Sequence, residues 1–332
     1  MHYKESKLIL EKIRKANRIL VNCHRSPDPD SVGSALSIFQ VLRKFGKEVK
    51  IVSPDKIHEN LRFLPYSEKV EATDFTNFNF SKYDLFLILD SSSFDQAIGS
   101  KNINLPSMDT IVIDHHESNR KFGQINIVDR RLASNCEVLY SIFEDWGIKI
   151  DNNTATTLYT GIVSDTGSFQ YPETTSKTLL IASKLIDCGA AKNEIILNIF
   201  RSFDYKLLKL WGEMLTKMQR DKLGFAWVAI SYETFAEYGH PAGAKSEAAS
   251  LFFSSIKGLN FGIVMIEQRR KVLNLSFRSK TNFDVSRFAQ EFGGAGHKTA
   301  AGAWFSFEDF NEAVNKVLTV ARKFAKEYNS VI

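Results

Sequence analysis

The sequence predicts an α/β protein: a doubly wound domain built on a mainly parallel sheet, joined by a helical connector to a smaller α+β domain. In the N-terminal half, short apolar runs without regular alternation are separated by helical patterns, which is typical of parallel strands buried on both faces. From residue 225 onward the pattern changes to strand-like segments mixed with helices. The length of 332 residues fits two domains of roughly 150 residues each.

The first domain is expected to begin with strands at 19–21, 49–52, 85–89 and 111–113. Between the first two, apolar residues at helical spacing predict a helix over 32–42, and Gly46 is positioned to end it. A strand–helix–strand series of this kind builds a doubly wound sheet. Further helical periodicity covers 134–146, 152–163, 173–188 and 192–220.

The second domain is expected to hold three strands and three helices. No Pro/Gly-rich linker precedes it, so a helical connector is expected rather than a flexible one. We therefore expect a first domain over 1–190, a connector over 191–218 and a second domain over 219–332. The strands are expected at 225–230, 261–266 and 272–277, and the helices at 245–257, 284–291 and 308–328.

Composition limits the environment and the partners. The 43 Lys and Arg residues exceed the 38 Asp and Glu residues by 5, which is too small an excess to predict binding to a long duplex, so a short or single-nucleotide ligand fits better. No apolar run approaches the ~20 residues that a spanning helix needs, and the N-terminus has no signal-peptide pattern. Three sparse cysteines fit a reducing cytoplasm.

Acidic and imidazole side chains stand where the expected strands of the first domain end. Because ligands of an open α/β sheet gather beyond the carboxyl ends of its strands, we expect these groups to share one crevice. Carboxylates this close would repel one another unless a cation lay between them, which favours a metal site. Asp165 ends another apolar segment and would complete the set. The other candidates are His24, Asp28, Asp30, Asp90, Asp114, His115 and His116.

Simpler roles are open for single members of this set. Asp30 could cap the helix that begins near residue 32, Asp90 could cap the helix that follows it, and aspartates are common turn residues. Four acids and several imidazoles in one crevice favour the metal site instead. Oxygen-rich coordination with some imidazole suits Mn²⁺, Mg²⁺ or Fe²⁺. So many groups suit two ions sharing a carboxylate better than one structural Zn²⁺.

The cysteines are expected to be structural. Cys23 adjoins His24, but alternation along a strand directs the two side chains to opposite faces, so Cys23 should lie in the core. Cys136 and Cys188 belong to no motif and should pack as well.

Two further segments could bind an anion. The glycine-rich stretch 293–302 permits close backbone approach, and the small residues after it suit a helix start that could hold a phosphate, although such a turn is also common without a ligand. Arg278, at the end of an expected strand, suits bidentate phosphate contact or simple solvation at the surface. The stretch 239–246 nearly matches a phosphate-binding P-loop, but Ala244 stands where glycine is needed, so we expect only a helix N-terminus there.

Together these motifs resemble the DHH phosphoesterase superfamily. They are His24-x-x-x-Asp28-x-Asp30-Ser-x-Gly-Ser, the strand-end Asp90, Asp114-His115-His116, Gly-Ile-Val-Ser-Asp165-Thr-Gly, and Gly293-Gly-Ala-Gly-His297-x-x-Ala-Ala-Gly. Their order and spacing cover nearly the whole chain. The two-domain layout is similar to the branch of nanoRNases (oligoribonucleases) and 3′-phosphoadenosine 5′-phosphate (pAp) phosphatases.

The resemblance implies a DHH catalytic domain, a linker, and a DHH-associated domain that binds substrate. It implies two divalent ions, Mn²⁺ first with Mg²⁺ or Co²⁺ as alternatives, held by His24, Asp28, Asp30, Asp90, His115 and Asp165, with Asp90 bridging. Asp90, Asp114 and His116 would be catalytic, His116 facing the phosphate. Substrate would be bound by Arg278, Gly294, Ala295, Gly296 and His297.

The implied activity is hydrolysis of short oligoribonucleotides to mononucleotides and of pAp to AMP, by a cytoplasmic enzyme that binds neither membrane nor long duplex and that could form a homodimer. Two residues depart from the family pattern, because Pro29 and Ala295 stand where the family usually has glycine. Pro29 could shift the metal-binding loop, and the methyl group of Ala295 could narrow the space for the ligand.

The alternatives to this activity are a RecJ-like single-strand exonuclease, a manganese pyrophosphatase, a phosphodiesterase for cyclic or linear dinucleotides, and a nucleotide sensor without catalysis.

Overall fold

The computed structural model describes residues 2–241 and 243–330, except for the side chains of 246, 247 and 254. Contacts divide the chain into two compact units, Met1–Ser202 and Phe203–Ile332. Each unit has its own sheet and its own hydrophobic cores.

The first unit is built on a six-stranded sheet in which every pair of neighbouring strands is parallel. The strand order is β3-β2-β1-β4-β5-β6, so the connections run in opposite directions on the two sides of the β1/β4 boundary. Such a switch point opens a crevice at the carboxyl ends of the strands. The strands are β1 (Arg18–Asn22), β2 (Glu48–Ser53), β3 (Val70–Ala72), β4 (Leu85–Leu89), β5 (Asp109–Asp114) and β6 (Ile125–Val128).

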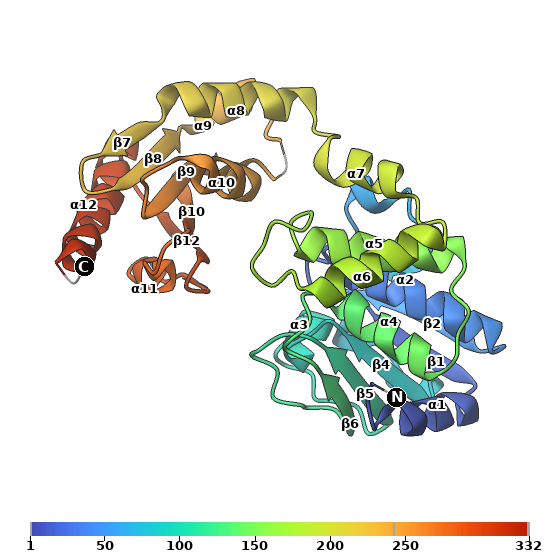
Figure 1. Cartoon of the computed structure of the whole chain (residues 1–332). Helices are drawn as coiled ribbons and strands as arrows, with labels where there is room; N and C mark the ends of the chain where they lie inside the picture. Colours follow the sequence, from blue (N-terminus) through green and yellow to red (C-terminus); the bar gives the residue numbers. More distant parts are fainter. Residues whose placement is uncertain (1, 242, 331–332) are drawn as a thin grey trace. The chain divides into compact units, whose positions relative to one another are not determined.

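Helices cover one face of this sheet, where α2, α4 and α5 pack together (Figure 1). The other face is covered by α3 and by single-turn 3₁₀ helices that contribute Phe75. Because both faces are buried, Val21 and Leu20 enter different cores although they are neighbours. The helices are α1 (Ser6–Lys15), α2 (Pro29–Lys44), α3 (Phe94–Ile98), α4 (Asn135–Asp145), α5 (Asn152–Asp165), α6 (Ser176–Asp187) and α7 (Lys192–Phe200).

Two glycines let α2 and α5 pack closely. A Cβ on Gly33 would lie 2.5 Å from the carbonyl oxygen of Thr157, and one on Gly161 would lie 2.3 Å from Asp30 Oδ1. Only hydrogen fits at these contacts, because real Cβ atoms do not approach so near. The close packing brings the end of α5 beside the start of α2.

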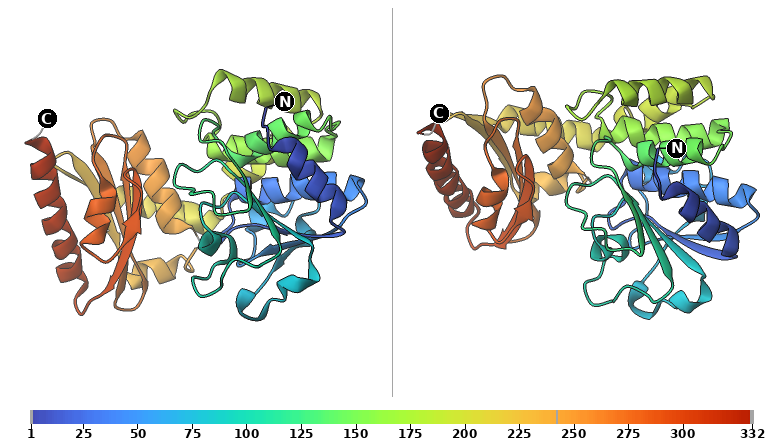
Figure 2. Two further views of the ribbon diagram at one scale, coloured as in Figure 1. Left: turned by 90° about the horizontal axis from the view of Figure 1, so that it is seen from below. Right: turned by 60° about the horizontal axis from the view of Figure 1, so that its bottom comes forward.

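The second unit has a mixed sheet in the order β11-β12-β10-β9-β8-β7, in which β8 and β9 are parallel and the other pairs antiparallel. α8 and α10 pack on one face, and α11 and α12 on the other (Figure 2). The elements are α8 (Tyr205–Lys217), β7 (Gln219–Asp221), β8 (Phe225–Ile230), α9 (Tyr232–Glu237), α10 (Ala244–Ser255), β9 (Phe261–Arg269), β10 (Val272–Ser279), α11 (Val285–Gln290), β11 (Ala295–Gly296), β12 (Ala300–Ser306) and α12 (Phe310–Asn329).

The expected fold class is confirmed, and four local expectations are wrong. The described part of the second unit holds six strands, where three are expected. The helix expected over 192–220 is two helices, because the Asp204 side chain accepts a hydrogen bond from Lys206 N at 2.7 Å and starts α8 anew. The glycine-rich stretch leads into the β11–β12 hairpin and not into a helix. Cys188 is exposed, whereas Cys23 and Cys136 are buried.

None of the helices in the described residues is long and apolar enough to cross a membrane.

Candidate functional site

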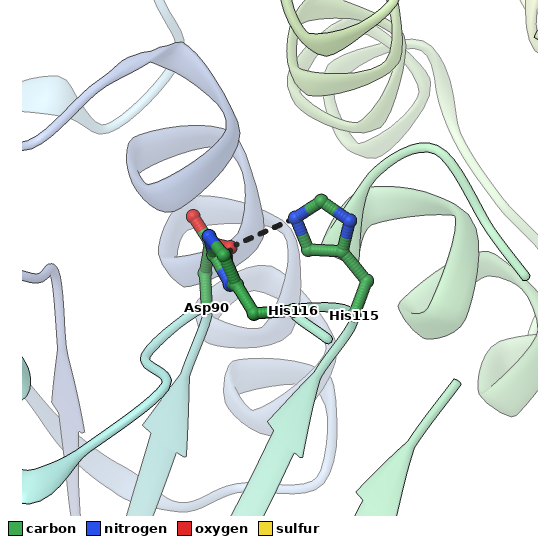
Figure 3. Close-up of side chains that lie close together, drawn as sticks. All are labelled: Asp90, His115 and His116. Atoms are coloured by element: carbon green, nitrogen blue, oxygen red, sulfur yellow. Dashed lines mark ion pairs between the residues drawn. The ribbon is translucent and has the colours of Figure 1, made fainter. Parts of the chain in front are cut away.

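Asp90 lies at the centre of the candidate site, directly after β4 and almost fully buried. Its two carboxylate oxygens face in different directions: Oδ2 is 3.4 Å from His24 Nε2 and Oδ1 is 3.4 Å from His115 Nε2. Figure 3 shows the His115 ring directed at Asp90. The backbone of Asp90 has φ of 48°, a left-handed conformation that Asp tolerates better than most residues and that often marks functional sites.

The first group of possible metal ligands is His24, Asp28 and Asp90. His24 follows β1, and its Nδ1 lies 2.8 Å from the carbonyl oxygen of Arg25. The bond to that carbonyl requires a proton on Nδ1, so Nε2 is free to bind a metal, as is usual for metal-binding histidines. Nε2 lies 3.3 Å from Asp28 Oδ2, while the other oxygen of Asp28 caps α2 by accepting from Ser31 N at 2.9 Å.

The second group is Asp30, His115 and Asp165. His115 Nε2 lies 3.9 Å from Asp30 Oδ2 and 3.6 Å from Asp165 Oδ2. Its Nδ1 is 3.3 Å from the carbonyl oxygen of Leu132, so His115 is oriented in the same manner as His24. Asp165 reaches the group from the end of α5 and not from a strand.

Asp30 has a second task in the fold. Its carboxylate accepts hydrogen bonds from the backbone N–H groups of Asn135, at 2.6 Å, and Cys136, at 3.0 Å. These donors belong to the first turn of α4, where free N–H groups and the helix dipole favour a negative charge. α4 therefore fixes the position of Asp30.

His116 differs from the other two histidines. Its Nδ1 lies 2.7 Å from Asp114 Oδ1, and Asn119 donates to the other oxygen of Asp114 at 2.7 Å. Asp90, His115 and His116 are also close enough to form a ligand group, but Nδ1 of His116 is engaged with Asp114. Asp114 thus orients His116 alone, and leaves its Nε2 for another partner.

The electrostatics of the carboxylates show how crowded the site is. Burial works against a charge on Asp90, but the imidazoles of His115 and His24 outweigh it and lower the pKa of that carboxyl. Burial, with the negative charge of Asp90, raises the pKa of Asp30 to about 7. Burial and the other carboxylates also raise the pKa of Asp165 well above its usual value.

The histidines respond in the opposite sense. Burial disfavours their charged form, yet the facing carboxylates raise the pKa of His24 to about 11 and that of His115 to about 10. The pKa of His116 is also raised, by Asp114 against the effect of burial. Without a metal, protons on these imidazoles therefore balance the carboxylates.

The residues present fit divalent metal ions. Asp90 Oδ1 and His115 Nε2 are buried and have no hydrogen-bond partner in the described part of the chain. The facing ligand atoms are 3.3 to 3.9 Å apart, close to the separations of about 3 to 4 Å expected for neighbouring ligands bound at about 2.1 Å to one ion. Carboxylates with imidazole suit Mn²⁺ or Mg²⁺.

The simpler capping roles considered for the aspartates are wrong. Asp28, not Asp30, caps α2, and Ser93, not Asp90, caps α3. Pro29 takes the first position of α2, where a missing N–H costs nothing. The departure from glycine at this position is therefore accommodated by the helix start.

In the second unit, Arg278 and the glycine-rich stretch meet at one end of the sheet. Arg278 pairs across the strands with Ala300, and His297 N donates to the carbonyl oxygen of Ala300 at 2.7 Å. A Cβ on Gly294 would lie 2.2 Å from Gly302 O, and one on Gly296 2.4 Å from Ala301 Cα. These two glycines are needed for close contact with β12. Ala295 stands between them without a positive φ, so its methyl group is tolerated.

Sequence reasoning missed two residues. Asn119 is buried and ties Asp114 to the Ser91 carbonyl; its place after the Asp-His-His run was the only available signal. Lys245, in the stretch rejected as a P-loop, lies near Arg278. Burial, together with the positive charge of Arg278, lowers the pKa of Lys245.

Comparison with known proteins agrees with this geometry. Residues 18–162 match the model of the DHH family, N-terminal domain. The chain is 26% identical to the bifunctional oligoribonuclease and PAP phosphatase NrnA of Thermus thermophilus over 97% of this chain and 95% of that protein. The NrnA protein of Bacillus subtilis is also 26% identical, over 96% of this chain and 98% of that protein.

A crystal structure of an exopolyphosphatase-related protein from Bacteroides fragilis has the same fold, with a TM-score of 0.89 and 23% identity over 98% of this chain and 97% of that chain. The first unit thus contains a stretch that matches the DHH family model, and the chain is similar over nearly its whole length to proteins named for oligoribonuclease and PAP phosphatase activities. The resemblance inferred from the motifs is confirmed.

Gly161→Ala should damage the site through packing alone. The new methyl group would collide with Asp30 Oδ1 and Cys136 Sγ, so we expect Mn²⁺ affinity to fall by about 10- to 100-fold, as for other residues that support ligands. Gly212→Ala is the control, because its Cβ would meet nothing within 4 Å. Titration calorimetry checks this, and wild-type Mn²⁺ affinity in Gly161→Ala would contradict it.

Asp165→Asn should separate metal binding from intrinsic stability. A carboxyl whose pKa is higher in the folded state than in the unfolded state destabilises the folded protein once the pH rises above the unfolded pKa of about 3.9. At pH 8, the metal-free variant should therefore melt at or above the wild-type temperature, whereas its stabilisation by Mn²⁺ should shrink. Thermal unfolding in EDTA and in MnCl₂ measures both.

Asp187→Asn, at the exposed end of α6, is the matched control for that experiment and should behave as wild type. If Asp165→Asn kept the full stabilisation by Mn²⁺, Asp165 would have no place among the ligands.

Proposed function

We propose that this chain is a metal-dependent phosphoesterase that hydrolyses short oligoribonucleotides to mononucleotides and pAp to AMP. The observation that carries the proposal is Asp90, whose two oxygens each face a separate histidine–carboxylate group. The names of relatives that are similar over nearly the whole chain supply the substrate class.

Two divalent ions, Mn²⁺ in the first place, would occupy the site. His24, Asp28 and Asp90 would hold one, and Asp30, Asp90, His115 and Asp165 the other. When bound, such ions lower the pKa of coordinated water and neutralise charge on phosphoryl oxygens. Asp90 and the histidines would exchange their mutual ion pairs for metal bonds.

His116 would act on the substrate. Burial opposes a charge on the His116 ring, but Asp114 holds Nδ1 and raises the pKa of the ring, so the form with a proton on Nε2 is favoured. That proton can bond a phosphoryl oxygen or pass to the leaving oxygen. Asn119 keeps Asp114 in place for this role.

The second unit would bind the nucleotide. Arg278 and the stretch Gly294 to His297 lie at one end of its sheet, and Lys245 lies near Arg278. So few cations suit a short substrate better than a long strand, which needs binding along many phosphates. All three cysteines are free, in keeping with a cytoplasmic enzyme.

A direct assay tests the proposal. Phosphate release from pAp and cleavage of end-labelled RNA of increasing length are measured with MnCl₂ and with EDTA. We expect turnover only with metal, fastest on pAp and on the shortest RNAs. Faster, processive degradation of a long strand would favour a RecJ-like exonuclease, and binding of pAp without turnover would favour a sensor.

His116→Ala should lower kcat by about 10²- to 10⁴-fold, the usual contribution of a general acid or base, without loss of metal. His58→Ala removes an exposed histidine outside the site and should leave kcat unchanged. Kinetics on pAp together with elemental analysis test this. Loss of metal in His116→Ala would make His116 a ligand instead.

Arg278→Ala should mainly raise KM. Losing a charged partner of the phosphate costs about 1.5 to 3 kcal/mol, which is about a 10- to 150-fold change at 1.4 kcal/mol per factor of ten. Arg287→Ala, an exposed arginine of α11, should leave KM unchanged. An unchanged KM in Arg278→Ala would remove it from the binding site.

A further inference from the structure

Trp304 is unusual among the tryptophans of this chain. Its side chain is 65% exposed, whereas the other three are buried or half-buried. It lies on β12 between residues that point into the core, since Ala301 and Ala303 are buried on the opposite face. An indole in this position leaves an aromatic face open to a ligand.

The register places Trp304 on the same face as Arg278. β12 pairs with β10 so that Ala300 lies opposite Arg278, Gly302 opposite Ser276, and Trp304 opposite Asn274. Because side chains alternate along strands, Arg278 and the residues at every second position on both strands point to one side. Arg278 reaches Ser250 of α10 on that side.

Beyond α10 this face is open along β12. α10 packs on β9 and β10, whereas β11 pairs only with Ala301 and Gly302. In the described strands, the part of β12 that carries Trp304 is therefore an edge. Gly302 lies between Ala300 and Trp304 on this face, and among the described residues a Cβ added to it would meet only the Leu275 carbonyl oxygen within 4 Å.

The two strands β10 and β12 carry the cation Arg278 and no acidic residue. Lys245 lies near Arg278 on the same side, where burial and the Arg278 charge lower its pKa. A cationic end and an exposed indole on one strand pair are the two features by which proteins bind single-stranded nucleic acid.

The spacing defines which part of a ligand each end would meet. Ala300 and Trp304 are four residues apart on β12, which corresponds to about 13 Å at about 3.3 Å per residue. Neighbouring bases of one strand are about 3.4 Å apart in a duplex. A phosphate at Arg278 and a base on Trp304 would therefore belong to different nucleotides.

We propose that Trp304 is a base-stacking subsite for a nucleotide further along the same oligonucleotide whose phosphate Arg278 holds. The inference rests on the proposed function and extends it. Stacking on an indole tolerates every base, so this subsite would select for length and not for sequence. A single aromatic residue at this distance suits a substrate of a few nucleotides.

The test compares a substrate that reaches Trp304 with one that does not. Trp304→Ala should raise KM for penta-adenylate by about 5- to 150-fold, the equivalent of about 1–3 kcal/mol for one stacked base, and leave KM for pAp within twofold of wild type. Trp304→Phe should restore most of the loss, because a phenyl ring also stacks. Tyr205→Ala, at the 73% exposed tyrosine of α8, is the control and should leave KM for both substrates unchanged.

A binding measurement makes the inference independent of turnover. In EDTA, penta-adenylate should quench tryptophan fluorescence of the wild type, and Trp304→Phe should lose that quenching. If the wild type hydrolysed neither substrate, the proposed function would fail while the fluorescence experiment still tested the subsite.

Three results would overturn the subsite. They are an equal loss on pAp and penta-adenylate in Trp304→Ala, wild-type KM for both, and a wild-type dimer that Trp304→Ala dissociates in light scattering. The last would assign the exposed indole to contact between two copies of this chain.

Discussion

The carboxylate of Asp90 faces an imidazole on each side, and the arrangement of the first unit serves this contact. β4 ends at the switch point of the sheet, so Asp90 emerges beside His24 after β1 and His115 after β5. The left-handed backbone at Asp90 is held between neighbouring strands, where its N–H donates to the carbonyl oxygen of Ile113 and Asn22 bonds the adjoining Leu89 N–H. Asp90 Oδ1 and His115 Nε2 are buried without a hydrogen-bond partner in the described part of the chain, so a cation can bind between them.

Function and stability conflict in this site. Asp30 and Asp165 have raised pKa values because burial and neighbouring carboxylates oppose their charge, so the metal-free fold carries a cost that bound cations would remove. The fold tolerates it because α4 donates two N–H groups to Asp30 and because Gly161 lets α5 approach without collision. The same packing that creates the repulsion also keeps the ligands in place.

The ends of the buried parallel strands are predictable from the sequence because short apolar runs locate these strands. The residues that follow parallel strands all lie at the same edge of the sheet. The structure has His24, Asp90 and His115 just after β1, β4 and β5 for that reason. Asp165 was a candidate, but its position at a helix end depends on the close approach of α2 and α5, which no local pattern shows. Asn119 and the donors from α4 were missed because a supporting contact leaves no periodic signal. The glycine-rich stretch that begins at Gly293 predicts a helix start, whereas the structure has the β11–β12 hairpin there, because glycine-rich turns precede helices and strands alike.

Diffraction from MnCl₂-soaked crystals at the manganese absorption edge tests the central claim most directly. We expect two anomalous peaks, one within bonding distance of Asp90 Oδ2 and His24 Nε2, the other within bonding distance of Asp90 Oδ1 and His115 Nε2. A single peak, or peaks that leave Asp90 uncoordinated, would contradict a site built on one shared carboxylate.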